Sequence, residues 1–165
     1  MNVDKKLIGE KVVRLYFSST TRDTIKEIIA TLYSKDARFR DAFLDVSGRR
    51  KVETQFVSML QAFDEYQLKS YDIEDNTESD RININAAASY VIKGRTYDLN
   101  QQTQLTLNDQ GLITYHHDIL RSSFTETLDK TPVLREVYSG WRKIVGLAVD
   151  PLLARRFNPD RNNKE

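Results

Sequence analysis

The hydrophobic pattern of this chain changes period near Tyr66, and that change limits the folds open to it. Before Tyr66, apolar residues recur every three or four positions, which is the spacing of amphipathic helices. After Tyr66, apolar and polar residues alternate, which is the spacing of strands with one buried face. Helices followed by a run of strands predict an α+β fold rather than a parallel α/β sheet.

Three helices are predicted before the change of period. Their apolar stripes are Leu7, Ile8, Val12, Leu15 and Tyr16 in the first, Ile25, Ile28, Ile29, Leu32 and Tyr33 in the second, and Val52, Phe56, Met59, Leu60 and Phe63 in the third. Thr24 and Glu27 have the spacing of a capping box, so the second helix is predicted to begin near Asp23 or Thr24. Residues 37–43 alternate only briefly and are interpreted as a short irregular piece.

Four strands are predicted after the change, at 66–74, 81–93, 96–108 and 112–121. The connections between them are polar or carry turn residues such as Gly94 and Gly111. Strands joined by three consecutive hairpins form an antiparallel meander.

A last helix is predicted over about 132–149, because Thr131 and Pro132 are typical of an N-cap and of the first helical position. Trp141 is expected to anchor it. Residues 144–149 are apolar on all sides, which favours burial in the domain or in a dimer interface; binding to a membrane surface is the less favoured alternative. We expect one domain over 1–150 and a partly disordered tail over 151–165.

The charge and residue composition exclude several classes of function. The chain has 25 basic and 24 acidic residues, so no overall field attracts nucleic acid. It has no cysteine, which excludes disulfides, thiolate chemistry and cysteine-bound zinc. It shows no apolar signal segment and no run of about 20 apolar residues that would span a bilayer. We therefore expect a cytoplasmic protein.

Small and polar residues interrupt the apolar faces of the predicted strands. Ala86 and Ala88 lie where larger residues would pack better, and Gln101 and Thr103 break a row of leucines. Apolar walls with a small floor and a few polar groups predict a ligand pocket. An equal alternative is that the alanines let a helix approach closely. Both faces of 112–121 are partly apolar, so helices would cover one face and a second subunit the other, giving a homodimer.

Three motifs in this order resemble the nuclear transport factor 2-like superfamily, including its SnoaL-like and ketosteroid isomerase-like branches. They are residues 32–43, similar to the family pattern LYA-D-A-x-F-x-D-P-F, then Gly48 before the third helix, and residues 105–118, similar to F-x-F-D-x-x-G-x-I-x-x-H-x-D. The resemblance covers about residues 7–121. It implies a cone, in which a curved antiparallel sheet wraps around the N-terminal helices with a cavity at the open end, here with an extra C-terminal helix.

The resemblance also implies candidate catalytic residues. Asp41 falls where ketosteroid isomerases keep their general base, and Tyr16 falls within one residue of their oxyanion-binding tyrosine. Thr103 replaces the second oxyanion donor of that family and Ala42 replaces a proline, which argues against the same reaction. The position of Asp118 resembles that of an aspartate in limonene epoxide hydrolase-like members, although the rest of their Asp–Arg–Asp arrangement is not evident. Scytalone dehydratase-like members pair an aspartate with a histidine, which a cavity holding Asp41, His116 and Asp118 could imitate.

Each candidate also has a purely structural interpretation. Asp41 could bind the following backbone in an Asx turn, and His116 could be a buried polar residue with a partner. Asp118 shares the face of His116 and could orient its ring, whereas His117 points the other way, so no metal site is expected. The residues expected to line the pocket are Phe56, Leu60, Phe63, Ala86, Ala88, Tyr90, Leu99, Gln101, Thr103, Leu105, Leu120 and Trp141.

Two classes of function remain, and the sequence does not decide whether the protein is an enzyme. The slightly favoured class is a non-catalytic binding or assembly module whose pocket holds a small apolar or carbonyl-bearing ligand. The alternative is a cofactor-free isomerase, cyclase, dehydratase or hydrolase, in which Asp41 moves the proton with help from His116 and Asp118, while Tyr16 or Thr103 binds the oxyanion. No cofactor or metal is expected in either case.

Overall fold

The computed structural model describes residues 4–42, 44–62, 64–75, 79–92 and 94–121. The elements in chain order are α1 (Lys5–Val13), the 3₁₀-helix η1 (Arg14–Tyr16), α2 (Arg22–Leu32), β1 (Tyr33–Arg40), β2 (Asp45–Ser47), α3 (Arg49–Ala62), β3 (Glu65–Asp75), β4 (Arg81–Ile92), β5 (Arg95–Leu107) and β6 (Ile113–Arg121). The predicted helix over 132–149, its Trp141 and the tail over 151–165 lie outside the described residues. Among the described helices, none has the length and hydrophobicity needed to cross a membrane.

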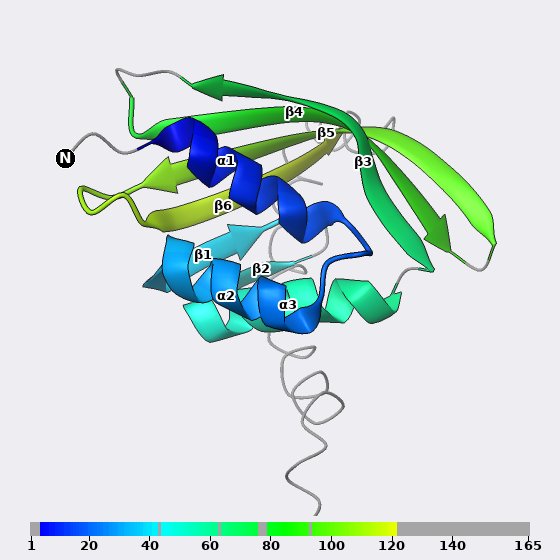
Figure 1. The fold of residues 1–165 in the computed structure, drawn as a ribbon, viewed down its shortest axis with the longest axis horizontal. Helices are drawn as coiled ribbons and strands as arrows, with labels where there is room; N and C mark the ends of the chain where they lie inside the picture. The colour runs from blue at the N-terminus through cyan, green and yellow to red at the C-terminus, as the bar shows by residue number, and fades with distance from the viewer. Residues whose placement is uncertain (1–3, 43, 63, 76–78, 93, 122–165) are drawn as a thin grey trace, which may run out of the picture.

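The change of period predicted both the three helices and the four long strands, and the structure confirms them (Figure 1). The start of α2 differs from the prediction. Its N-cap is Thr21, whose hydroxyl accepts a hydrogen bond from the amide of Thr24 at 3.2 Å. A threonine at the N-cap satisfies one of the free amides of the first turn, so the helix begins at Arg22, just before the predicted start near Asp23 or Thr24.

One six-stranded sheet has the order β2-β1-β6-β5-β4-β3. The antiparallel meander from β3 to β6 is as predicted. The sheet as a whole is mixed, however, because β1 pairs with β6 in parallel. The prediction of a wholly antiparallel sheet was therefore wrong at this pair. Tyr33 was assigned to the second helix but is the first residue of β1. Residues 37–43, interpreted as an irregular piece, belong mostly to the same strand. Local alternation does not reveal a strand's distant partner, which is why the parallel pair was missed.

The sheet is curved and its concave face holds the helices (Figure 1). α1 contacts β3 and β4, whereas α3 contacts β1, β2 and α2. Register shifts mark a bulge in β3, between Leu68 and Ser70, and another in β6, between Ile113 and Tyr115. Bulges bend strands and increase their twist. These features confirm the predicted α+β class with a curved sheet around N-terminal helices.

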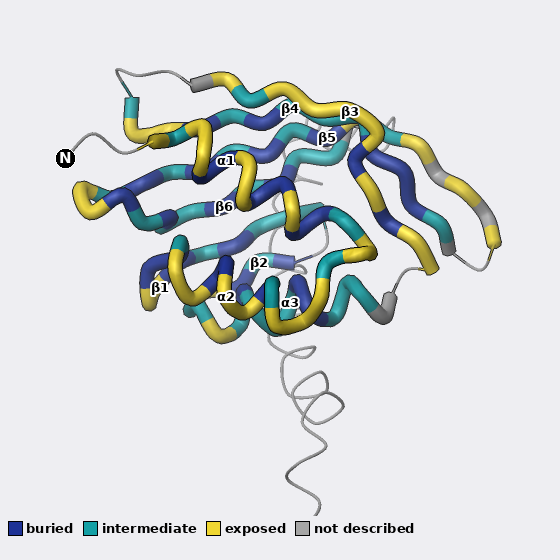
Figure 2. The backbone as a smooth tube through the Cα atoms, viewed as in Figure 1, coloured by how far each residue is buried: buried dark blue, intermediate teal, exposed yellow. Residues whose placement is uncertain are grey.

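Buried and more exposed residues alternate along the strands, so each strand has one side toward the core and one toward the outer face (Figure 2). Ile82, Ile84, Leu105 and Ile113 are buried and pack with the helix residues Val12, Ile25, Ile29 and Phe56 in one hydrophobic cluster. Burying such side chains contributes about 1.5–3 kcal/mol each relative to exposure. The cluster fixes the position of the polar groups described below, because they lie on the same inward faces.

Candidate functional site

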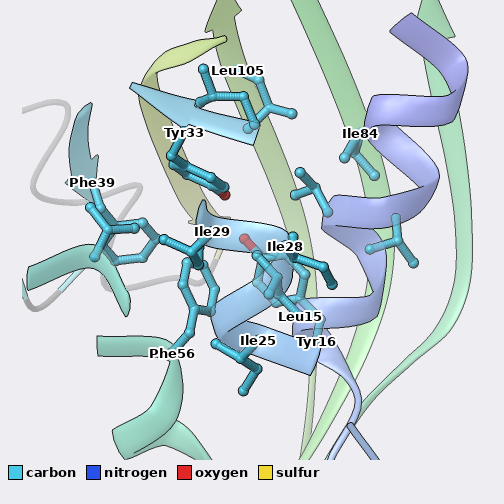
Figure 3. Packing of buried hydrophobic residues seen from close by; sticks show 14 of the residues in the cluster. Leu15, Tyr16, Ile25, Ile28, Ile29, Tyr33, Phe39, Phe56, Ile84 and Leu105 are labelled. Carbon is cyan, nitrogen blue, oxygen red and sulfur yellow. The ribbon is translucent and has the colours of Figure 1, made fainter. Parts of the chain in front are cut away.

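Two tyrosine hydroxyls lie inside the hydrophobic cluster and meet the polar residues of β6. Tyr16 comes from η1 and Tyr33 from the first position of β1 (Figure 3). Both rings are buried, and they lie among apolar side chains including Phe56. A buried tyrosine hydroxyl needs a hydrogen-bond partner, since leaving it without one costs about 1–3 kcal/mol. His116 is a hydrogen-bond partner of both hydroxyls.

His116 binds a tyrosine at each of its ring nitrogens. Nε2 lies 2.6 Å from the Tyr16 hydroxyl oxygen, and Nδ1 lies 2.6 Å from the Tyr33 hydroxyl oxygen. The residue is 0% exposed, and its ring centroid lies 5.1 Å from that of Phe39 and 5.5 Å from that of Phe56. The imidazole is therefore held on both sides by hydroxyl groups and enclosed by aromatic rings.

Asp118 is the second polar residue that β6 turns inward, and it is 6% exposed. The Tyr16 hydroxyl oxygen lies 2.7 Å from each of its carboxylate oxygens, and Thr103 donates to Oδ1 at 2.6 Å. Nε2 of His116 lies 3.1 Å from the same Oδ1. Tyr16 thus bridges the imidazole and the carboxylate.

One assignment of protons satisfies these groups together. Tyr33 donates to Nδ1 of a neutral His116, whose Nε2–H points at the Tyr16 oxygen, and Tyr16 donates to Asp118. A hydroxyl has one proton and two lone pairs, so Tyr16 can accept and donate at once. The tautomer in this assignment follows from the hydrogen-bond network.

The polar groups continue from Thr103 along β5 and β4. Gln101 donates from Nε2 to the Thr103 hydroxyl at 3.1 Å, and Tyr90 donates to Oε1 of Gln101 at 2.9 Å. The Tyr66 hydroxyl oxygen lies 3.3 Å from that of Tyr90, and the two rings are 4.4 Å apart between centroids. Cross-strand pairing places them there, since Thr103 pairs with Asp118 and Tyr66 with Tyr90. We call the eight linked residues the polar chain: Tyr33, His116, Tyr16, Asp118, Thr103, Gln101, Tyr90 and Tyr66.

Burial keeps the tyrosines of the polar chain protonated. It raises the pKa of Tyr16 and of Tyr33 well above the usual value, and the nearby negative charge of Asp118 raises both further. Burial is also the main cause of the raised pKa of Tyr66 and of Tyr90. Desolvation disfavours the phenolate form, so these side chains are hydroxyl donors at neutral pH and not bases.

Asp41 makes a different set of contacts from the other three candidates. Its Oδ1 accepts a hydrogen bond from the amide of Leu44 at 2.6 Å, and its own amide donates to the Leu44 carbonyl at 3.0 Å. This is an Asx-type turn between β1 and β2, one of the two interpretations that the sequence left open. The charge of Asp41 also raises the pKa of Tyr66 and of Tyr90 as a smaller cause, so Asp41 acts on the Tyr66 end of the polar chain.

The structure therefore joins Tyr16, His116 and Asp118 directly, while Asp41 forms the turn and acts on the Tyr66 end of the polar chain through its charge. The expected pocket residues that are buried are Phe56, Ala88, Tyr90, Gln101, Thr103 and Leu105. Those that are partly buried are Leu60, Ala86, Leu99 and Leu120, while Phe63 and Trp141 lie outside the described residues. That these side chains line a ligand cavity stays a prediction. His117 lies on the opposite face, where its ring is 5.7 Å from that of Tyr115.

The sequence analysis missed Tyr33 and Tyr66 as members of the site, because Tyr33 had been placed in the apolar stripe of the second helix and Tyr66 only marked the start of a strand. A usable signal was that inward-facing His116 and Asp118 each need hydrogen-bond partners, and tyrosines on apolar stripes can supply them. Within the described ranges, no three histidine, aspartate or glutamate side chains are grouped so as to hold a metal ion.

Comparisons with known proteins give the fold. The sequence matches no protein-family model and no curated protein. An NTF2-like protein of unknown function from Exiguobacterium sp. 255-15 has a TM-score of 0.58 at 14% identity, over 70% of this chain and 99% of that chain. A proposed polyketide cyclase from Xanthomonas campestris pv. campestris has a TM-score of 0.55 at 18% identity, over 73% of this chain and 93% of that one.

A proposed isomerase of the SnoaL-like family from Agrobacterium tumefaciens C58 has a TM-score of 0.55 at 12% identity, over 70% of this chain and 96% of that one. At such identities these likenesses define a fold, and the chain has the fold of NTF2-like proteins. This confirms the resemblance to the NTF2-like superfamily, with its SnoaL-like members, at the level of structure. Function belongs to individual sites on such a fold and needs its own argument.

Proposed function

We propose that this protein is a non-catalytic NTF2-like module that binds a small, mostly apolar ligand at the Tyr66 end of the polar chain. The observation that carries the proposal is the engagement of the candidate catalytic groups with one another. Both nitrogens of His116 and both carboxylate oxygens of Asp118 already bind protein hydroxyl groups. A buried base whose acceptor atoms already hold hydrogen bonds to the protein is poorly placed to take a proton from a substrate.

The energetic cost of breaking the hydrogen bonds to His116 supports this argument. A substrate that reached His116 would have to displace Tyr16 or Tyr33 from a hydrogen bond. The displaced hydroxyl would stay buried in an apolar surrounding, at a cost of about 1–3 kcal/mol. We therefore assign the part of the polar chain from Tyr33 to Thr103 to the stability of the fold.

The other end of the polar chain has a composition suited to a ligand. Gln101, Tyr66 and Tyr90 present an amide and two hydroxyls, and the partly buried Leu60 and Leu99 are apolar neighbours in the same cluster. A few polar groups among apolar walls are typical of small-molecule sites. Hydroxyl donors that stay protonated suit a ligand with a carbonyl oxygen.

Native mass spectrometry of the purified full chain tests this proposal. We expect a stoichiometric small molecule that is released on denaturation and is retained less well by Tyr90→Phe. Tyr115→Phe, on the other face of the sheet, is the matched control and should retain it fully. A ligand-free protein that also binds no carbonyl-bearing apolar probe would contradict the proposal. The same spectra count subunits and so test the expected homodimer through the outer face of the sheet.

A cofactor-free enzyme is the second candidate, and one observation favours it. The Tyr16 hydroxyl touches both an imidazole and a carboxylate in an apolar enclosure, which is an arrangement able to pass a proton. In this alternative Asp41 is the base of an isomerase, cyclase, dehydratase or hydrolase, and His116 and Asp118 assist. Conversion of a retained ligand by the wild-type protein, abolished in both Asp41→Asn and Asp118→Asn, would favour this alternative over binding alone.

A further inference from the structure

The hydrogen bonds from Gln101 to Asp118 run in one direction, toward the carboxylate. A carboxylate only accepts hydrogen bonds, so it fixes which groups donate along the rest of the polar chain. Thr103 donates to Oδ1 of Asp118 at 2.6 Å, and Gln101 donates from Nε2 to the Thr103 hydroxyl at 3.1 Å. The NH₂ group of Gln101 is therefore directed at Thr103, and its other amide atom, Oε1, is the acceptor that meets the tyrosines.

Tyr90 uses its proton on this acceptor. Its hydroxyl donates to Oε1 of Gln101 at 2.9 Å, an ordinary length for such a bond. Gln101 pairs with Ala86, four residues before Tyr90 on the same strand, and four residues of a strand span about 13 Å. The two side chains therefore extend toward each other over Ala88, whose small side chain leaves room for them. Tyr90 has one proton, and this bond engages it.

Tyr66 ends the series, and its hydroxyl makes longer contacts. Its oxygen lies 3.3 Å from that of Tyr90 and 3.5 Å from Oε1 of Gln101, whereas O–H···O bonds are usually about 2.5–3.0 Å. Since the proton of Tyr90 is engaged with Gln101, Tyr66 is the donor in both contacts. Burial raises the pKa of Tyr66, so the oxygen keeps its proton at neutral pH.

The position of the Tyr66 side chain is fixed even though these contacts are long. Its ring centroid lies 4.4 Å from that of Tyr90 and 5.9 Å from that of Tyr16. Its backbone carbonyl accepts a hydrogen bond from the amide of Ser18 at 2.8 Å, and the residue pairs with Tyr90 across the strands. A donor that is held in place before binding loses little freedom when a ligand arrives. A carbonyl oxygen at an ordinary distance would form a stronger bond than either contact it replaced.

We propose that Tyr66 determines the specificity of the ligand site, because its hydroxyl donates to the carbonyl oxygen of the ligand. Tyr90 and Gln101 are positioning residues, which engage each other and so leave the Tyr66 proton to the ligand. This inference rests on the proposed function and deepens it, since it names the ligand as an apolar carbonyl compound and assigns the group that recognises it. A hydrocarbon of the same shape fills the same space but offers no acceptor.

Titration of the ligand-free full chain with 1-tetralone and with tetralin, which lacks the carbonyl, tests the inference. Amide chemical shifts give the two dissociation constants. We expect the wild-type protein to bind the ketone about tenfold more tightly, as for one hydrogen bond in a buried site. Tyr66→Phe keeps the ring, so it should bind the two compounds equally and bind tetralin as the wild type does. Tetralin binding thus shows that this variant is folded.

Tyr90→Phe distinguishes a positioning role from a direct contact. Without the Tyr90 hydroxyl, Oε1 of Gln101 is left to accept the proton of Tyr66, so the preference for the ketone should fall although Tyr66 is intact. Combining this change with Tyr66→Phe should lower the preference no further than Tyr66→Phe alone. Tyr115→Phe removes a hydroxyl on the outer face of the sheet and should keep the full preference.

Each failure has a different meaning. A preference for the ketone that survives in Tyr66→Phe, or equal binding of both compounds by the wild-type protein, would overturn this inference and leave the ligand site in place. An additive loss in the double variant would show that Tyr90 itself contacts the ligand, against the positioning role assigned to it. Binding of neither compound would overturn this inference together with the proposed function.

Discussion

The hydroxyl oxygen of Tyr16 lies 2.6 Å from Nε2 of His116, across 100 positions of the sequence. This contact joins the 3₁₀-helix after α1 to the last strand of the sheet. The same hydroxyl also reaches the carboxylate of Asp118 at 2.7 Å. One side chain therefore completes the hydrogen bonds of two buried polar residues, and its loss would leave both of them short of a partner.

Removing this hydroxyl should destabilise the protein. Tyr16→Phe keeps the ring and its packing against Phe56 but deletes the bonds to His116 and Asp118. We expect the free energy of unfolding to fall by about 1–3 kcal/mol, because buried groups are left unsatisfied. Urea unfolding followed by circular dichroism measures the change.

Tyr115→Phe is the control for this variant, since Tyr115 is half-buried on the opposite face of the sheet. A change within about 0.5 kcal/mol is expected there, as for most surface substitutions. Equal losses in the two variants would mean that the polar chain contributes nothing particular to stability.

The raised pKa values of the buried tyrosines predict a loss of stability at alkaline pH. Burial raises the pKa of Tyr16, Tyr33, Tyr66 and Tyr90, so the folded state keeps protons that the unfolded state releases. Stability from this source is fully present below the unfolded pKa of about 10 and falls as the pH rises above it, by about 1.4 kcal/mol per pH unit for each tyrosine.

Tyrosinate absorbance and circular dichroism recorded in one alkaline titration test this. The four tyrosines with raised pKa values, Tyr16, Tyr33, Tyr66 and Tyr90, should ionise only together with unfolding. Ionisation of every tyrosine in the folded protein would show that the interior is open to solvent and would remove the basis for the prediction.

Much of the fold could be predicted because its strongest signals are local. Alternation along β4 placed Ile82, Ile84 and Ala88 inward, and the structure buries all three. The parallel pairing of β1 with β6 could not be predicted in the same way. It joins Phe39 to His116, and the short β1 carries no mark of a partner so distant in the sequence. The alternation over 37–43 was too brief to be assigned as a strand from the sequence.

The candidate site was likewise predictable in part. The period of two placed His116, Asp118, Thr103 and Gln101 on one face, which the hydrogen bonds between them support. The contribution of Tyr33 was not predictable, since it was counted in the apolar stripe of the second helix. The helix ends one residue before it, at Leu32, and this boundary decides which way the hydroxyl points.

The position of the α2 N-cap gives a prediction that separates the structure from the sequence pattern. Thr21 accepts the amide of Thr24, so Thr21→Ala should lower the free energy of unfolding by about 1 kcal/mol. Thr24→Ala should cost less, because the Thr24 side chain bonds only to the cap hydroxyl, at 2.9 Å. Chemical denaturation of both variants gives the comparison. The reverse order would support the capping box at Thr24 and Glu27 that the sequence suggested.

Asp41 offers the sharpest distinction between a structural and a catalytic role. Its Oδ1 accepts the amide of Leu44 at 2.6 Å, and an asparagine side chain also has an oxygen in that position. Asp41→Asn should therefore keep the turn and most of the stability, whereas Asp41→Ala should lower the free energy of unfolding by about 1 kcal/mol through loss of the hydrogen bond. Thermal and urea unfolding of the two variants measure this difference.

The same pair of variants bears on chemistry, because asparagine cannot take up a proton as a carboxylate does. If Asp41 acts only through the turn, Asp41→Asn retains ligand binding as well as stability, and the alanine variant loses some of both. If Asp41 is a general base, the asparagine variant stays folded and binds ligand but does not convert it. A stable asparagine variant with intact binding and lost conversion would thus refute a purely structural role, and it would do so without any ambiguity from misfolding.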